Sequence, residues 1–353
     1  MTTAEQISTT SLQSRTTSLE GVRVWLWSVA ALVFLMVMVG GATRLTESGL
    51  SITEWRPVLG ILPPLSEAAW LSEFEKYKQI PQYSKLFPTM TLDEFKVIYY
   101  WEWGHRVLGR VIGLAFAVPL LWFWTRGVLN NRLKWQLLGL LSLGGLQGAV
   151  GWWMVKSGLV DRVEVAPERL AVHLLLASLT FTALVWLAVG MKPARIEAQA
   201  AHVRTGASAL VWLVLFQIGL GALVAGSRAG YTYNTWPLMD GRFVPPVENL
   251  FRQDPWWINF LENITTIQFE HRIFAYVLLA YALFHAWQAL RKAAGTKAAK
   301  RAVAVAGLVS CQALIGIVTL LLQVPLWAGL LHQAFAMVVL GMAVVHARRC
   351  CEA

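Results

Sequence analysis

The stretch YYWEWGHR (99–106) runs directly into VLGRVIGLAFAVPLLWFW (107–124). The second stretch is apolar and close to the roughly 20 residues that a helix needs to span a bilayer. Glu102, His105 and Arg106 stand at the mouth of this helix, where ionisable side chains are costly to bury and are usually functional. The stretch therefore predicts a membrane helix that carries chemistry near one surface.

The composition extends this prediction to the whole chain. Of its 353 residues, 56% are hydrophobic and only 14% are charged, whereas soluble domains carry about 25% charged residues. We predict an all-α polytopic membrane protein with eight transmembrane helices. Apolar stretches place these helices near 24–43, 101–124, 135–154, 170–191, 207–227, 264–290, 302–323 and 326–346.

Basic residues gather on one side of this topology. The N-terminus, the loops near 125–134, 192–206 and 291–301, and the C-terminal tail hold half of the 30 Lys and Arg residues. By the positive-inside rule, both termini are expected to be cytoplasmic. The net charge of +10 then reflects topology, and we expect no nucleic-acid partner.

Residues 1–22 are rich in Ser and Thr and are predicted to form a disordered cytoplasmic N-terminus. This segment is short, which favours a bacterial inner membrane over mitochondria. The long outer loops near 44–99 and 228–263 contain no cysteine, so no structural disulfide is expected there.

Several motifs recur in the same order in the two halves of the chain, which indicates an internal repeat. We predict two parallel-repeat four-helix bundles, an N-terminal half at 23–195 and a C-terminal half at 205–350. The matched motifs are Gly49/Trp55 with Gly230/Trp236, Pro63-Pro64 with Pro245-Pro246, EWGHR (102–106) with QFEHR (268–272), Gln147/Gly151 with Gln312/Gly316, and His173 with His332.

Four histidines, a pair from each half, are expected at one depth, in the first turns of helices that enter from outside. They are His105 and His173 in the first half, and His271 and His332 in the second. A lone helical histidine is more often a hydrogen-bonded core residue than a ligand. Two repeat-related pairs instead favour bis-histidine heme sites between facing helices.

Arg106 and Arg272 directly follow one candidate ligand in each half. They are candidates to hold heme propionates near the outer surface. The alternative is that both are interfacial arginines that extend toward water, and the sequence favours neither interpretation.

His285 and His346 follow His271 and His332 by the same interval, and so lie deeper on similar helix faces. A second, deep heme between them is conceivable from this spacing. However, His346 is close to Arg348 and Arg349 at the inner edge, where a solvated histidine is ordinary. We predict that neither residue is a ligand.

Together these motifs resemble the heme A synthase family, over nearly the whole chain. The resemblance is carried by GGATRLTESGLSITEW (40–55), EWGHR (102–106), AGYTYNTWPLM (229–239), EHR (270–272), and the histidines at 173 and 332. Some bacterial members carry a cysteine pair in the first outer loop. This chain has none and resembles the cysteine-lacking branch with proteobacterial and mitochondrial members, so any thiol–disulfide step is in doubt here.

The resemblance implies roles for particular residues. It implies that His271 and His332 ligate a resident heme b cofactor, and that His105 and His173 line the site of the heme O substrate. It also implies that Glu102 is catalytic. A structural ion pair of Glu102 with Arg106 or a neighbouring loop is the alternative.

The implied activity is oxidation of the heme O methyl substituent through an alcohol to the formyl group of heme A. Implied partners are a heme O synthase, an electron donor such as a ferredoxin, and the lipid bilayer; the oligomeric state stays open. One alternative is a multi-heme b electron-transfer cytochrome without substrate conversion. Another is a transporter, which the scarcity of polar residues within the spans disfavours. An electron carrier needs no carboxylate, yet Glu102 occurs only in the first half, opposite Gln268.

Overall fold

The computed structural model describes residues 3–55, 59–192 and 198–352. Within these residues, eight helices are long and apolar enough to cross a membrane, as predicted. They are α1 (Thr3–Leu45), α4 (Leu92–Thr125), α5 (Asn131–Lys156), α6 (Pro167–Gly190), α7 (Arg204–Gly226), α10 (Ile264–Lys292), α11 (Lys297–Leu321) and α12 (Leu326–Cys350). Four short helices occupy the long loops: α2 (Glu67–Tyr77), α3 (Pro81–Leu86), α8 (Val247–Leu250) and α9 (Asn259–Glu262).

Helix α4 begins well before the expected residue 101. A capping box starts it, in which the backbone N–H of Glu94 donates to Thr91 Oγ1 and the backbone N–H of Thr91 donates to Glu94 Oε2. His105 therefore lies more than three turns into α4, not in its first turn as expected. His173, His271 and His332 lie in the second turns of their helices.

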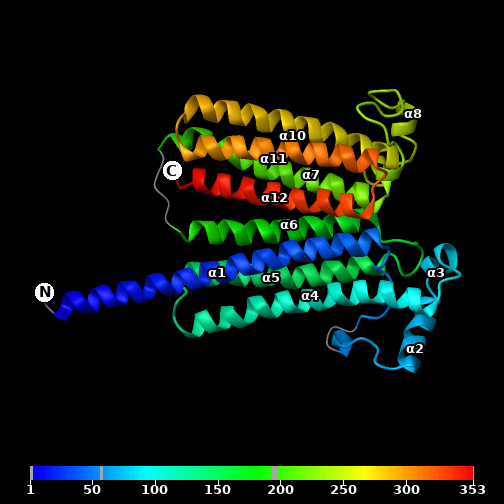
Figure 1. The fold of residues 1–353 in the computed structure, drawn as a ribbon, viewed down its shortest axis with the longest axis horizontal. Coiled ribbons are helices and arrows are strands. Elements are labelled where there is room, and N and C mark those ends of the chain that lie inside the picture. Colours follow the sequence, from blue (N-terminus) through cyan, green and yellow to red (C-terminus); the bar gives the residue numbers. More distant parts are fainter. Residues whose placement is uncertain (1–2, 56–58, 193–197, 353) are drawn as a thin grey trace.

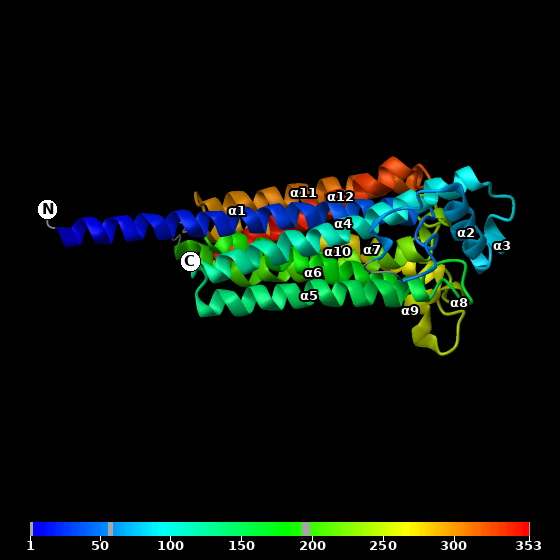
Figure 2. The same ribbon diagram turned by 90° about the horizontal axis from the view of Figure 1, so that it is seen from below.

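Both chain ends lie at one end of the bundle, and α2, α3 and α8 lie at the other (Figure 1). The first part of α1 projects beyond the bundle in both views (Figures 1 and 2). An unpacked helix of this kind is marginal in water, so disorder within residues 1–22 stays a prediction; residues 1–2 lie outside the described residues. The packed part begins before residue 23, because Val22 is already fully buried.

The spanning helices form two groups with matching contacts. Helix α1 packs against α4 and α6, and α5 packs against α4 and α6. In the same way, α7 packs against α10 and α12, and α11 packs against α10 and α12. The internal duplication stays a prediction, and its predicted boundary at residue 195 lies outside the described residues.

The inner helices α1, α6, α7 and α12 join the two groups through contacts of α6 with α7, α6 with α12, and α1 with α12. Small buried side chains such as Ala30, Ala188, Ala207 and Ala343 let these helices approach closely. The outer helices differ between the groups. Only 11% and 6% of the residues in the most apolar stretches of α4 and α5 are buried, against 28% and 22% for α10 and α11.

Candidate functional site

The two candidate histidines of each half come from helices that face each other across a bundle. His105 on α4 and His173 on α6 belong to helices that both pack against α1 and α5. His271 on α10 and His332 on α12 belong to helices that both pack against α7 and α11. The fold therefore places each sequence-predicted pair on opposite sides of one four-helix group.

Each of these histidine rings lies against a glycine on a neighbouring helix. A methyl group on Gly316 would lie 2.7 Å from His332 Cε1, closer than such contacts normally come. The equivalent distances are 3.0 Å from Gly151 to His173 Cε1, 3.2 Å from Gly221 to His271 Cε1, and 3.3 Å from Gly40 to His105 Nε2. A side chain at Gly316 would force the His332 ring to shift, whereas at Gly151, Gly221 and Gly40 the ring would have to move by a few tenths of an ångström.

Three of the four histidines also contact a glutamine one helical turn from that glycine. Gln217 Nε2 lies 3.1 Å from His271 Nδ1 and donates to the His271 backbone carbonyl at 3.1 Å. Gln147 makes the same two contacts with His173, and Gln312 makes them with His332. In each case the glutamine amide, on a neighbouring helix, contacts both the ring and the backbone carbonyl of the same histidine. Sequence analysis noted Gln147 and Gln312 but missed Gln217, although Q-x-x-x-G recurs at 217–221.

Arg106 and Arg272 differ in how many of their N–H groups have a hydrogen-bond partner. Arg106 donates to the backbone carbonyls of Ile52 and Glu54 and pairs with Glu102 at 2.6 Å. Arg272 donates to the matching carbonyls of Tyr233 and Thr235, but its Nε and Nη1 are buried without a partner among the described residues. Arg272 therefore has donors available for an anion.

Glu102, on α4, is 4% exposed and lies against the loop that follows α1. Its Oε2 accepts hydrogen bonds from Ser51 Oγ and from the backbone N–H of Ile52, both at 2.8 Å. Its Oε1 accepts from Arg106 Nε and Nη2. These contacts match the structural alternative considered for this residue. A catalytic role for Glu102 stays a prediction.

Gln268 occupies the position of Glu102 in the second half. Its Nε2 donates to the Ala229 carbonyl at 2.9 Å, and its Oε1 is buried without a partner among the described residues. Because Gln268 is neutral, Arg272 lacks the adjacent counter-charge that Glu102 gives Arg106. Glu270 of the EHR motif lines an apolar pocket with Phe216 and Phe274 instead.

His285 and His346 contact each other directly, with 2.9 Å between their Nε2 atoms. An iron atom between two such nitrogens would hold them roughly 4 Å apart, given metal–nitrogen bonds of about 2 Å. The contact supports the prediction that they are not heme ligands. The expected solvation of His346 is wrong, because its side chain is fully buried.

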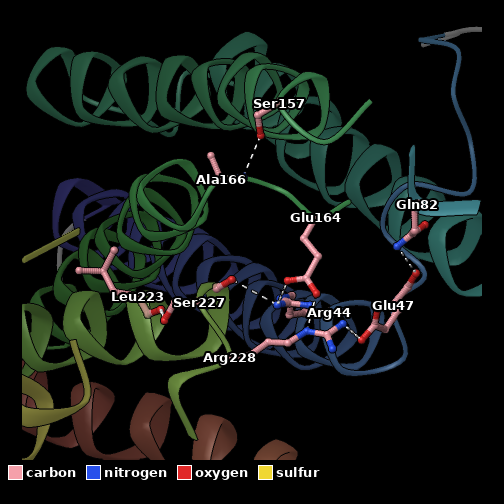
Figure 3. A network of polar contacts seen from close by, with 10 residues as sticks. Arg44, Glu47, Gln82, Ser157, Glu164, Ala166, Leu223, Ser227 and Arg228 are labelled. Atoms are coloured by element: carbon pink, nitrogen blue, oxygen red, sulfur yellow. Dashed lines mark hydrogen bonds and ion pairs between the residues drawn. The ribbon is translucent and has the colours of Figure 1, made fainter. Parts of the chain in front are cut away.

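A cluster of ion pairs joins the two halves at the end of the bundle opposite the chain termini (Figure 3). Glu164, in the loop between α5 and α6, pairs with Arg44 at 2.6 Å and with Arg228 beyond α7. Arg228 also pairs with Glu47. Burial and the neighbouring Arg44 lower the pKa of Arg228, yet its guanidinium stays charged at neutral pH. Arg228 thus connects the second half to two loops of the first.

The two histidine pairs fit a heme iron better than a free metal ion. Among the described residues, no group of three or more His, Cys, Asp and Glu could hold a metal. Two facing histidines supply only two ligands, so they would suit a heme iron, whose porphyrin brings its own ring nitrogens. In the C-terminal half, the unpartnered N–H groups of Arg272 could also donate hydrogen bonds to a propionate.

Comparison with known proteins gives consistent matches. The family model described as cytochrome oxidase assembly protein matches residues 23–344. A protein named heme A synthase from Beijerinckia indica is 60% identical over 92% of this chain and 91% of its own length. Relatives of the same name from Methylobacterium sp. (strain 4-46) and Bradyrhizobium sp. (strain BTAi1) are 60% and 53% identical, over 93% and 95% of this chain and 91% and 92% of their own lengths.

Proposed function

The chain belongs to the cytochrome oxidase assembly protein family, and from this premise we propose that it is a heme A synthase. The observation that carries the proposal is the pair of facing histidines in each half, each ring accommodated by a glycine of a neighbouring helix. An enzyme that converts one heme with the help of another needs two such sites.

We assign the heme O substrate to His105 and His173. The enzyme is then an oxidoreductase that acts on a C–H group of heme O and produces the formyl group through an alcohol stage. The four-helix group around α4–α6 orients the macrocycle and shields it from water. Arg106 holds the loop at Ile52 and Glu54 over the outer end of this site.

We assign a resident heme b to His271 and His332, with Arg272 as its propionate partner. When bound, heme b supplies one-electron redox chemistry. The side chains of Gln217 and Gln312 orient the two rings, and the free donors of Arg272 suit a carboxylate.

For Glu102 we propose a catalytic role, in which its carboxylate takes up a proton as the substrate carbon is oxidised. Its i, i+3 spacing from His105 places both on one face of α4. Its present partners, Ser51, Ile52 and Arg106, also make it an anchor of the outer loop. A substitution that keeps the anchor but removes the ionisable group separates the two roles.

The remaining assignments follow from the chemistry. A heme O synthase supplies the substrate, and a carrier such as a ferredoxin exchanges electrons with the site. We place the protein in a bacterial inner membrane with both termini in the cytoplasm, in line with the distribution of Lys and Arg.

The test is a heme inventory of membranes that contain a heme O source. Heme A is expected only when this protein is co-expressed, and His105→Ala is expected to abolish it. If heme O stays unchanged while the protein binds only heme b, the chain is an electron-transfer cytochrome instead.

A further inference from the structure

The two halves differ at one position beside their first histidines. Gly40 on α1 and Gly221 on α7 lie against His105 and His271, respectively. One turn before Gly221 stands Gln217, but one turn before Gly40 stands Met36. The Met36 methyl group packs over Gly109, one turn below His105. A thioether has no N–H to donate to the histidine backbone carbonyl and is only a weak acceptor for a ring N–H, so Met36 cannot hold the ring as a glutamine amide can.

The rings of His271 and His105 also differ in which of their atoms face the neighbouring glycine. Cε1 and Nδ1 of His271 face Gly221, and Gln217 lies against both ring nitrogens, at 3.1 Å from Nδ1 and 3.4 Å from Nε2. In contrast, Nε2 and Cδ2 of His105 face Gly40. Among the described residues, His105 is the one member of the four whose ring makes no hydrogen bond with a glutamine.

The helix that carries His105 also packs less extensively against one of its neighbours. Helix α10, which carries His271, packs along α11 over a much longer seam than α4 shares with α5. The two sites also differ in the charge beside their arginines, and this difference too favours heme retention in the second half. Glu102 neutralises Arg106 at 2.6 Å, whereas Gln268 leaves Arg272 free to attract a propionate.

We propose that Met36 leaves His105 as an exchangeable axial ligand, so that the N-terminal site releases its heme while the C-terminal site retains its own. Met36 and Gln217 are then positioning residues that determine which heme is substrate and which is cofactor. The inference rests on the proposed function, because it assumes that both sites bind heme. It explains physically how two similar sites in one chain treat their hemes differently.

Heme release measures this directly, without turnover. The purified full-length protein, loaded with heme, is mixed with excess apomyoglobin, which traps released heme. The wild type should release heme in a fast phase that His105→Ala removes and a slow phase that His332→Ala removes. Met36→Gln, a swap of similar volume, should slow the fast phase by roughly 10–100-fold, the usual effect of a partner that orients a metal-bound histidine. Gln217→Met should speed the slow phase by a similar factor.

Met36→Leu is the matched control, because it changes the shape of the side chain without adding an amide group. Its fast phase should equal that of the wild type. The proposal is overturned if Met36→Gln leaves the fast phase unchanged, or if Met36→Leu slows it equally. Failure of the proposed function has a different outcome, in which heme exchanges normally in two phases but no heme A is formed from heme O. A protein that binds no heme would overturn both.

Discussion

Among single side chains, His271 and His332 should decide whether the resident heme is present. Each ring is held by a glutamine and packs against a glycine. Alanine at either position removes the imidazole and leaves no other ligand in its place. We expect alanine at either position to abolish the low-spin bis-histidine absorption spectrum and to lower heme b content strongly. Retention of the full spectrum would refute the assignment.

Glu102 should decide whether the substrate is converted. Glu102→Gln keeps the size and one acceptor for Ser51 and Ile52, and the second half shows that a glutamine fits beside an arginine at this position. We expect heme b and folding to persist while heme A falls by roughly 10²–10⁴-fold, as for a lost acid–base group. Chromatography of extracted hemes should show heme O or its alcohol accumulating. Near-normal heme A would leave Glu102 as a loop anchor only.

His285 and His346 should not contribute a heme ligand. The double substitution His285→Ala/His346→Ala removes a buried hydrogen bond, so thermal stability should fall. The ratio of heme to protein and the bis-histidine spectrum should stay unchanged. Loss of a stoichiometric heme from this variant would restore the deep-heme hypothesis.

At this scale the sequence predicted the ligand candidates because paired, repeat-related histidines are rare within membrane helices. It did not predict that both arginines bind loop carbonyls, or that only Arg272 keeps buried donors without a partner among the described residues. The motif is nearly identical in both halves, and the difference arises from the neighbouring Glu102 and Gln268. Likewise, His346 is buried because it faces His285 on a helix distant in sequence.

Among the helices, α11 offers a matched test of the glycine contacts. Gly316→Ala would place a methyl group 2.7 Å from His332 Cε1, whereas Gly307 has no neighbour within 4 Å among the described residues. We expect Gly316→Ala to displace the ring and weaken the bis-histidine spectrum. Gly307→Ala should leave the spectrum intact and raise stability by roughly 0.5–1 kcal/mol. Equal spectra for the two variants would contradict the packing seen here.

The number and order of the spanning helices follow from hydropathy, since each span must satisfy its backbone hydrogen bonds internally. The start of α4 could not be found this way. Its first turns are polar and lie in the outer region, where the Thr91 and Glu94 capping box defines the helix end. That signal is present in the sequence at 91–94, although hydropathy does not detect it.

For the whole molecule, the ion-pair cluster around Glu164 should hold the outer ends of the halves together. Glu164→Gln leaves Arg44 and Arg228 close together without a shared carboxylate. We expect the free energy of unfolding in detergent to fall by roughly 1–3 kcal/mol. The control is Glu262→Gln, which breaks the more exposed pair with Arg162 at 3.3 Å and should cost at most about 1 kcal/mol. Equal decreases in melting temperature for the two variants would show that the cluster stabilises the protein no more than an exposed ion pair does.

The depth of the histidines makes the membrane voltage relevant to the reaction. From His332, α12 continues for about 27 Å to Cys350 but only about 9 Å back to Leu326. If the termini are cytoplasmic, as the basic residues predict, an electron from a cytoplasmic donor travels outward across most of the hydrocarbon core. An inside-negative potential drives that movement by up to about 2.3 kcal/mol per 100 mV. Heme A formation with such a donor should then slow when an ionophore collapses the potential, whereas a donor at the outer surface would make the rate independent of voltage.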